Sequence, residues 1–482
     1  MFYNKRAQIT VFIIVGLIIL IGAATFFILR DTAVREQFEE GSQKIAVESV
    51  SSDFRPVQEY ITTCVRDVAR EGLVRIGRHG GYAYTDELVA NRLDPTSREA
   101  NSVFYLPGHE DYKVAYWWHM DSGDDCFATS SCTFSSKRLP LRGSNSVESH
   151  LEEYVEKEVI RCMDEFRSLS QMGFDVDIVT DPSAEVDIAD SNVFVNLKMP
   201  VSATKDTRNQ DLTFYTTVLD VDFASIYNMA EEITEFQESN AFLETQLIEL
   251  IALYSGTSRT SLLPPFYDPF VSRLGGDVRQ AWTRTEVKST LMSVLASYVP
   301  LISFSESKTI NLPSLNEDPY DAAVFSSMLF SLNNSELELL YDIELDYKNW
   351  WDMYVKIGSS EIIEPGDQDI PVLGDIPILG SAMRQALPYT YQFGYDVSYP
   401  VMVTLRDSTA FDGDGFVLKF ALESNIRNNM PVSSSPDAGG FDMSSSLYDS
   451  IFCSEENYNS GEVTVRARDS STGELLEGAN VD

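Results

Sequence analysis

The pattern of apolar and polar positions changes sharply near the start of this chain of 482 residues. Residues 11–29 form an unbroken run of nineteen residues without a charged side chain, and Lys5 and Arg6 lie just before it. At a rise of about 1.5 Å per residue, such a helix is long enough to cross the roughly 30 Å hydrocarbon core of a bilayer. We therefore expect residues 9–29 to contact a lipid bilayer, within an amino-terminal anchor over 1–30.

The basic residues before this run predict its orientation. A short basic segment stays in the cytoplasm, so the chain after Arg30 is expected outside the cell, as the ectodomain of a single-pass protein of the cell membrane. A cleaved secretory signal is the alternative, because the small residues 22–24 lie inside the run. The apolar stretch continues through Leu29, which favours a retained anchor.

Two segments behind the anchor carry apolar residues at helical spacing, over 57–76 and 150–171. A capping box over Ser149–Glu152 is expected to open the second. Cys64 and Cys162 lie on the apolar stripes of these two helices, so packing the stripes together would bring the sulfurs within bonding distance. Two free, buried thiols are the alternative.

Strands and helices alternate farther along the chain. Residues 82–147 are irregular and aromatic, and the period-two alternation over 193–199 predicts a half-buried antiparallel strand. Further strands are expected over 212–222 and 416–422, and helices over 223–237, 241–254, 285–298 and 320–332. The mixture predicts an α+β ectodomain of helices and antiparallel sheet.

The second half of the chain echoes the first. Residues 199–204 (MPVSAT) and 399–404 (YPVMVT) share their Pro-Val step and final Thr, and each stretch continues into a charged turn and an aromatic strand. This predicts a duplicated α+β unit, with chance similarity of two strands as the alternative.

The expected organisation follows from these elements. After the anchor come a stalk and disulfide-linked helical region over 31–172, a first α+β unit over 173–310, a second over 311–432, and a linker with the start of a β-sandwich-like domain over 433–482. Residues 461–481 resemble the opening strands of an immunoglobulin-type sandwich, which needs about seven strands. Because only two such strands are present, the chain is expected to be a fragment of a longer protein. The alternative is that its last residues form a short hairpin that docks elsewhere on the chain.

Charge narrows the range of partners. The chain holds 36 Lys and Arg against 74 Asp and Glu, a formal net charge of −38, so we expect no nucleic acid partner. Adaptation to concentrated salt would explain so acidic a surface, and so would binding of divalent cations. The acids are spread along the chain, which favours the halophilic explanation.

Five cysteines lie in the predicted extracellular part, where disulfides persist. Cys126 and Cys132 flank a short polar spacer, which predicts a second disulfide that closes a small loop. Cys453 is then left without a predicted partner. Closely spaced cysteine ligands are lacking and only four histidines occur, so a zinc site is not expected.

Few residues offer chemistry. Asp412 and Asp414, separated by a glycine, resemble the start of a calcium loop, but Phe416 stands where an EF-hand needs oxygen, so a tight turn is the favoured interpretation. Ca²⁺ is the one cofactor considered. His119 beside Trp118 is interpreted as a core histidine, because no hydrolase or phosphate-loop motif accompanies it. No catalytic constellation emerges, so an enzyme is not expected.

Residues 5–10 (KRAQIT) resemble the class III, prepilin-type signal of archaeal pilins. That resemblance implies cleavage between Ala7 and Gln8, which leaves the apolar helix on the mature protein. Phe12 stands where pilins usually carry the Glu that assists subunit docking, so assembly into a filament does not follow. The whole pattern is similar to membrane-anchored archaeal surface proteins with pilin-like amino ends.

Two functions from different classes remain. The first is a membrane-anchored extracellular surface protein with a structural, adhesion or interaction role and no enzymatic activity. The alternative is an exported, membrane-anchored hydrolase with carboxylate catalytic residues. A concave pocket that holds two carboxylates with raised pKa would favour the hydrolase.

Overall fold

The computed structural model of the chain describes residues 50–109, 111–126, 131–256, 261–265, 270–271, 280–304, 328–330, 332, 341–358, 360–367, 389–391 and 393–432. The predicted anchor, the Ala7–Gln8 signal and the segment 433–482 lie outside them. Among the described residues, no helix has the length and apolar character needed to cross a membrane. These residues cluster into two units: unit 1 comprises residues 50–59, 168–181 and 198–214, and unit 2 comprises the rest.

The helices agree with most of the helical spacing in the sequence. The longer ones are α2 (Arg55–Arg78), α3 (Val147–Cys162), α5 (Phe223–Asn240), α6 (Phe242–Tyr254) and α7 (Arg284–Tyr298). Shorter ones are η1 (Asp164–Phe166), α4 (Arg167–Gln171), η3 (Val299–Leu301) and η4 (Phe411–Gly413). Four predicted helices are thus confirmed to within a few residues, as α2, α5, α6 and α7.

The helix predicted over 150–171 differs from the observed structure in two ways. Its capping box lies one turn earlier: the Ser146 hydroxyl accepts from the Ser149 amide at 3.2 Å, and the Ser146 amide donates to the Ser149 hydroxyl at 2.7 Å. The helix also ends at Cys162, because residues 164–166 take positive φ. No glycine or proline in this stretch signals that break, so the prediction of one continuous helix was wrong.

The strands form two main sheets and several two- or three-stranded ones. They are β1 (Ser102–Phe104), β2 (Lys113–Met120), β3 (Phe134–Ser135), β4 (Phe174–Ile178), β5 (Ser183–Ile188), β6 (Val193–Lys205), β7 (Arg208–Leu219), β8 (Phe270–Val271), β9 (Trp282–Thr283), β10 (Ser303–Phe304), β11 (Leu329–Phe330), β12 (Asp342–Asp346), β13 (Tyr354–Ile357), β14 (Ile362–Ile363), β15 (Gly366–Asp367), β16 (Tyr389–Thr390), β17 (Tyr395–Asp407), β18 (Phe416–Arg427) and β19 (Met430–Pro431). β11 lies where the sequence predicted a helix over 320–332, and residues 320–327 lie outside the described part.

The first sheet is built around β6, which pairs with β4, β5 and β7. β6 alternates buried and partly exposed residues, which confirms the half-buried strand predicted at its start. Its last five residues pair antiparallel with β4, from Ile178 opposite Val201 to Phe174 opposite Lys205. β5 leads into the start of β6 through a tight turn, in which the Ala189 amide donates to the Asn192 carbonyl at 2.9 Å.

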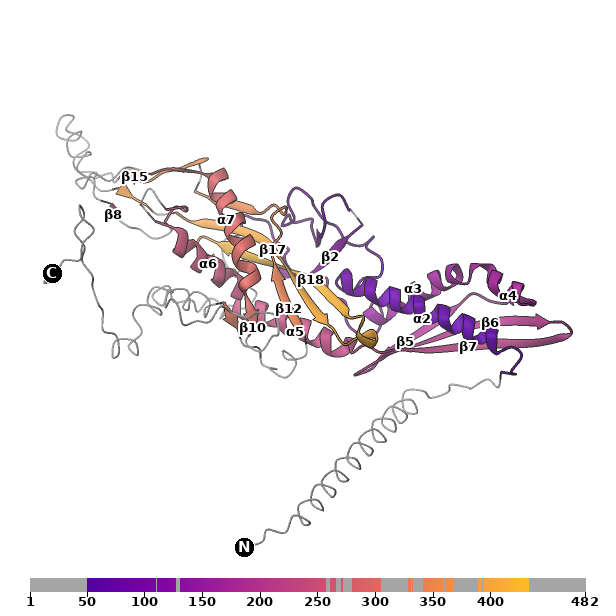
Figure 1. Cartoon of the computed structure of the whole chain (residues 1–482). Helices are drawn as coiled ribbons and strands as arrows, with labels where there is room; N and C mark the ends of the chain where they lie inside the picture. The colour runs from indigo at the N-terminus through magenta and orange to yellow at the C-terminus, as the bar shows by residue number, and fades with distance from the viewer. Residues whose placement is uncertain are drawn as a thin grey trace, which may run out of the picture. The chain divides into compact units, whose positions relative to one another are not determined.

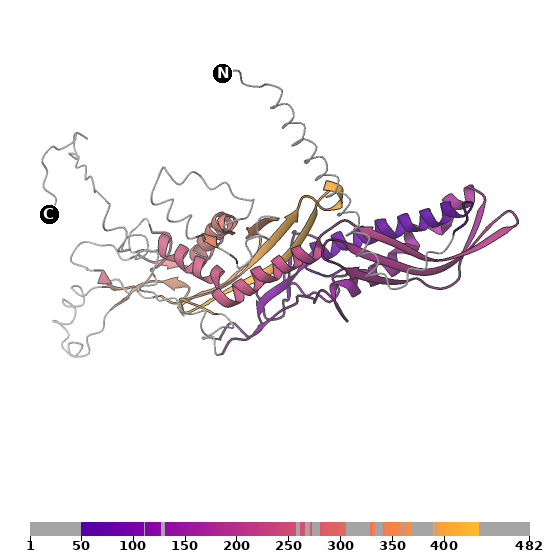
Figure 2. The same ribbon diagram turned by 90° about the horizontal axis from the view of Figure 1, so that it is seen from below.

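The second sheet is built around β17 and lies in unit 2. β18 pairs along one edge of β17, while β12 and β13 share the other edge. Beyond β18 lie β2, which runs parallel to it, and then β1. Helices α5 and α6 pack against this sheet, as the two views show (Figure 1, Figure 2).

β2 corrects the expectation of an irregular region over 82–147. Seven of its eight residues are buried, and Trp117 at its centre stacks on Phe420 of β18 with ring centroids 4.5 Å apart. A strand buried on both faces shows no alternation of apolar and polar residues. Period-two reasoning therefore could not detect it.

The central strands of the two sheets have partners in the same chain order. β6 pairs with two strands that precede it, β4 and β5, and with β7, which follows it. β17 pairs with β12 and β13, which precede it, and with β18, which follows it, and in both sheets the earliest of these strands pairs with the carboxyl half of the central strand. The registers agree with the sequence echo, because Asp175 lies opposite Thr204 in the first sheet and Glu344 lies opposite Thr404 in the second.

Candidate functional site

Two disulfides join the cysteine pairs that the sequence predicted. Cys64 of α2 is bonded to Cys162, the last residue of α3, with their Cα atoms 5.7 Å apart. Cys126 is bonded to Cys132, with a Cα separation of 5.3 Å. The first bond ties together two helices that are far apart in sequence, and the second closes a small loop after β2.

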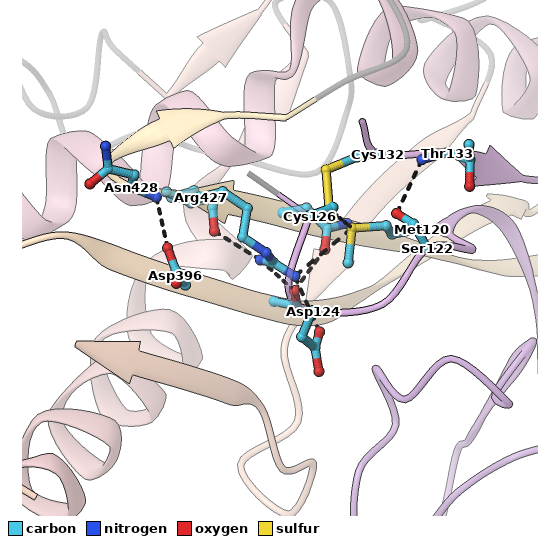
Figure 3. The surroundings of a disulfide bond; sticks show 12 residues. Met120, Ser122, Asp124, Cys126, Cys132, Thr133, Asp396, Arg427 and Asn428 are labelled. Atoms are coloured by element: carbon cyan, nitrogen blue, oxygen red, sulfur yellow. Dashed lines mark hydrogen bonds and ion pairs between the residues drawn. A yellow bond between two sulfur atoms is a disulfide. The ribbon is translucent and has the colours of Figure 1, made fainter. Parts of the chain in front are cut away.

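The second disulfide lies beside a partly buried ion pair at the end of β18. Figure 3 shows Arg427 and Asp124 pointing toward each other next to Cys126. Arg427 Nη2 lies 3.2 Å from Asp124 Oδ1, and the Arg427 side chain is fully buried. Its Nη1 donates to the Val397 carbonyl and the Ser398 hydroxyl. The guanidinium therefore fastens the loop after β2 to the two central strands of the sheet.

Two buried carboxyl groups flank this pair on the polar end of β18. Glu423 Oε2 accepts from the Met120 amide at 2.6 Å, and burial raises the pKa of Glu423 to about 8. Glu244 of α6 accepts from the Asn425 amide and from Gln237 Nε2, both at 2.7 Å. Burial raises the pKa of Glu244 to about 7. In both cases hydrogen bonds to the carboxylate oppose the shift but do not cancel it.

These groups hold elements of unit 2 together. The Glu423–Arg427 end of β18 is fully buried and bonds to β2, to α6 and to β17. Neither of the two clefts described next includes Glu244 or Glu423. We therefore assign this cluster a structural role in unit 2.

Two clefts meet at the last turns of α2, in unit 2, and share Val74 and Arg78. The first has a volume of about 280 Å³ and is lined by Glu71, Val74, Arg75, Arg78, His79, His109, Asp111 and Tyr112. The second has a volume of about 410 Å³ and is lined by Val74, Arg78, Asp342, Arg406, Asp407, Ser408, Gly413, Asp414, Gly415, Phe416 and Val417. The carboxyl groups with raised pKa, Asp124, Glu148, Glu244 and Glu423, line neither cleft.

The two candidate calcium ligands lie on the loop between β17 and β18. Asp412 takes a left-handed backbone with φ of 59°, and the Asp414 carboxylate forms an ion pair with Arg70 at 2.6 Å. Across the described ranges, no group of three or more His, Cys, Asp or Glu side chains is placed to hold a metal ion. The loop is the tight connection between strands that the glycines at 413 and 415 favour, both with positive φ.

His119 lies within β2 as a buried histidine. Burial lowers its pKa, and its ring packs near that of Tyr116, with centroids 5.5 Å apart. It lines neither cleft. The core interpretation of the sequence therefore fits its position.

Sequence reasoning missed a row of glutamates on α3. Glu148, Glu152 and Glu156 are spaced four residues apart, so they share one face of the helix. Their carboxylates accept from the amides of Ile188, Val186 and Ala184 in β5, at 3.0, 3.0 and 2.9 Å. We call these residues the glutamate row. The spacing is visible in the sequence, but nothing local indicates that a strand edge lies against it.

Comparisons with known proteins do not extend this description. Searches against protein-family models, curated proteins and solved structures found no match to the chain. The function is therefore argued from the residues and the geometry alone.

Proposed function

We propose that this chain is a single-pass, membrane-anchored extracellular protein with a structural, adhesion or interaction role at the cell surface. The observation that carries the proposal is the pair of disulfides, Cys64–Cys162 and Cys126–Cys132. Such bonds persist in oxidising compartments and are rare in the cytosol. The apolar run over 11–29 behind Lys5 and Arg6 supplies the anchor and the orientation that bring both bonds outside.

The charge of the chain supports the same location. A formal net charge of −38 disfavours nucleic acid partners and keeps an exposed domain soluble in concentrated salt, where repulsion between carboxylates is screened. Cleavage between Ala7 and Gln8, as in archaeal prepilin-type signals, belongs to the proposal. It would leave the apolar helix on the mature chain.

The exported hydrolase receives less support from the described residues. That alternative calls for a concave pocket with two carboxylates of raised pKa. The buried, pKa-raised carboxyls Glu244 and Glu423 serve as hydrogen-bond acceptors for backbone amides within the core. We therefore propose a structural, adhesion or interaction role at the cell surface in preference to a hydrolase.

We also infer that the ectodomain is built from a duplicated α+β unit. The common chain order of the partners of β6 and β17, together with the register of Thr204 and Thr404, supports duplication over chance similarity. The carboxyl-terminal residues 433–482 are proposed to begin a β-sandwich-like domain, on the resemblance of their sequence.

The location can be tested by treating intact cells with an added protease. The proposal predicts that the chain sediments with membranes and that its ectodomain is digested from outside, while a cytosolic marker protein survives. Recovery of the full-length chain in the soluble fraction, protected from the protease until the cells are broken, would contradict it.

A further inference from the structure

Cationic side chains gather at the end of α2 in a chain that is otherwise strongly acidic. Arg75 and Arg78 lie in the last turn of the helix, three residues apart, so they share one face. Both line the first cleft, beside His79 and His109. In a chain with a formal net charge of −38, this cleft brings two guanidinium groups and two imidazoles together with two carboxylates, Glu71 and Asp111.

Among the described residues, neither arginine of this cleft forms an ion pair with its two carboxylates, Glu71 and Asp111. Arg75 Nε donates to the Ala83 carbonyl at 2.6 Å, which fixes the guanidinium without using a charge. Glu71, one of the two acids that line the cleft, makes a hydrogen bond with Tyr154. Arg78 is exposed, and none of the ion pairs found among the described residues includes it.

The second cleft holds three acids, Asp342, Asp407 and Asp414, and none of them forms an ion pair with Arg78. There the Asp414 carboxylate is paired with Arg70, and Asp407 Oδ1 accepts from both the amide and the hydroxyl of Thr409. Arg406, the other arginine of that cleft, is paired with Glu344 at 3.1 Å. Arg78 thus lines both clefts and forms no ion pair within the described residues.

Arg78 lowers the pKa of two neighbouring groups, as a smaller contribution than burial. Burial is the main cause of the lowered pKa of His79, and Arg75 and Arg78 lower it further. The pKa of Lys419 is lowered to about 8, again mainly by burial and then by Arg406 and Arg78. An anion in the cleft would relieve the repulsion among these groups.

We propose that the first cleft binds a tetrahedral oxyanion, phosphate or sulfate, between the guanidinium groups of Arg75 and Arg78. A planar guanidinium presents a fork of N–H donors that matches oxyanion oxygens in pairs. The volume of about 280 Å³ leaves room for such a group as a free ion or as the terminal ester of a larger molecule. Asp111 on the cleft wall opposes binding by its charge.

The competing explanation is that both arginines only stabilise the carboxyl end of α2, where the helix dipole favours cations. The two explanations predict different effects of the substitution Arg78→Lys. Lysine keeps the charge that the dipole needs but loses the fork that the oxyanion needs. Arg161, in the last turn of α3 and paired with Glu158, provides a matched control of the same residue type and helix position.

The test is calorimetric titration of the full-length chain in non-ionic detergent, with about 1 M NaCl to suppress non-specific attraction. The ligands are inorganic phosphate, sulfate, methyl phosphate and acetate. We expect saturable binding of phosphate and sulfate near millimolar concentration, since two charge-assisted contacts supply only a few kcal/mol, where 1 mM corresponds to about 4.1 kcal/mol. If methyl phosphate binds as tightly as phosphate, the cleft accepts the terminal phosphate ester of a larger molecule. If methyl phosphate binds more weakly, the ligand is the free ion.

Four variants decide the assignment. Arg78→Gln should weaken phosphate binding at least about tenfold, Arg78→Lys several-fold and Arg161→Gln not at all, while Asp111→Asn should strengthen it. Unchanged affinity in Arg78→Lys, or acetate bound as tightly as phosphate, would overturn the proposal, as would the absence of saturation in the parent chain. The result is independent of whether the chain is membrane-anchored.

Discussion

Glu423 and Glu244 are fully buried carboxyl groups in a protein that has no shortage of exposed acids. Transfer of a carboxylate from water into the core disfavours its charged form, which is why their pKa values rise to about 8 and about 7. At neutral pH Glu423 is therefore mostly protonated. A neutral carboxyl group can sit beside the backbone amides of β2 and β18 without a full ionic desolvation cost.

Replacing Glu423 with Gln should flatten the pH dependence of stability. Because the folded pKa of about 8 lies above the unfolded value near 4.3, the stabilising contribution is complete below about pH 4 and is lost as pH rises through 8. Between these two pKa values, each rise of one pH unit lowers the free energy of unfolding by about 1.4 kcal/mol through this group. Chemical denaturation at several pH values measures the slope.

The matched control for this variant is Glu344→Gln, which removes a half-exposed carboxylate that is paired with Arg406. It should leave the slope between pH 5 and 8 close to that of the parent chain. A Glu423→Gln profile parallel to the parent profile over this range would show that Glu423 does not titrate as described.

Gly77 marks a close approach between α2 and β18. A Cβ built at this position would lie 2.3 Å from the Val417 carbonyl oxygen and 2.6 Å from the Phe416 ring. In an unobstructed helix, Gly→Ala stabilises by roughly 1 kcal/mol. Here we expect Gly77→Ala to destabilise by about 1–3 kcal/mol, because the backbone of β18 must shift. A thermal melt measures the sign of the change: a lower melting temperature is expected, and a higher one would contradict the close contact between α2 and β18.

Residue pairs differ in how far the sequence reveals them. Cys64 and Cys162 lie on amphipathic stripes, so helix packing alone brings them together. Glu423 meets Met120, and Arg427 meets Asp124, across 303 positions of chain. No local pattern predicts these contacts, because they depend on β2 pairing with β18.

At the scale of elements, the glutamate row of α3 closes one edge of a strand. The amides of Ala184, Val186 and Ile188 point away from β6, and unpaired amides at a strand edge invite pairing with another chain. The carboxylates of Glu156, Glu152 and Glu148 accept them instead. The helix therefore satisfies the edge and also blocks it.

Glu152→Ala tests the middle of this row. It leaves the Val186 amide without its acceptor at a part-buried position, which should cost about 1–3 kcal/mol. Glu153→Ala, the neighbouring residue on the same helix, removes an exposed ion pair with Lys157 and should cost at most about 1 kcal/mol. Hydrogen exchange at Val186 should accelerate in the first variant only. Equal stability of the Glu152→Ala and Glu153→Ala variants would argue against a stabilising role of the glutamate row.

The two disulfides should contribute unequally to stability. The Cys64–Cys162 bond spans a sequence separation of 98, and the Cys126–Cys132 bond spans 6. Loop-closure entropy predicts about 5 kcal/mol for the longer loop and about 2 kcal/mol for the shorter. Denaturation of the two paired Cys→Ala variants should show that order. The reverse order would mean that α2 and α3 remain together without their covalent link.

The elements also show where hydrophobic patterning succeeds and fails. One-sided elements such as α2, α5 and β6 were predicted well, because one face of each meets water. β2 is an inner strand of its sheet and is buried on both faces, so its apolar run carries no period. The break after Cys162 comes where residues 164–166 take positive φ, and no glycine or proline within 161–171 signals it.

At the scale of the whole molecule, the central strands of two sheets have partners in the same chain order, within an acidic chain that two disulfides reinforce. The α+β class follows from the mixture of periods in the sequence. The pairing of β12 and β13 with one edge of β17 does not, because a long insertion separates β13 from β17. The sequence echo at 199–204 and 399–404 predicted a duplicated unit but did not reveal this arrangement.

We propose that the folded chain resides in an oxidising compartment at the cell surface. The most direct measurement is the intact mass of the chain isolated from membranes after thiol alkylation, before and after reduction. With two disulfides among its five cysteines, we predict that a single alkyl group is added before reduction and five after it. Five alkyl groups on the unreduced chain, recovered from the soluble fraction, would contradict the account.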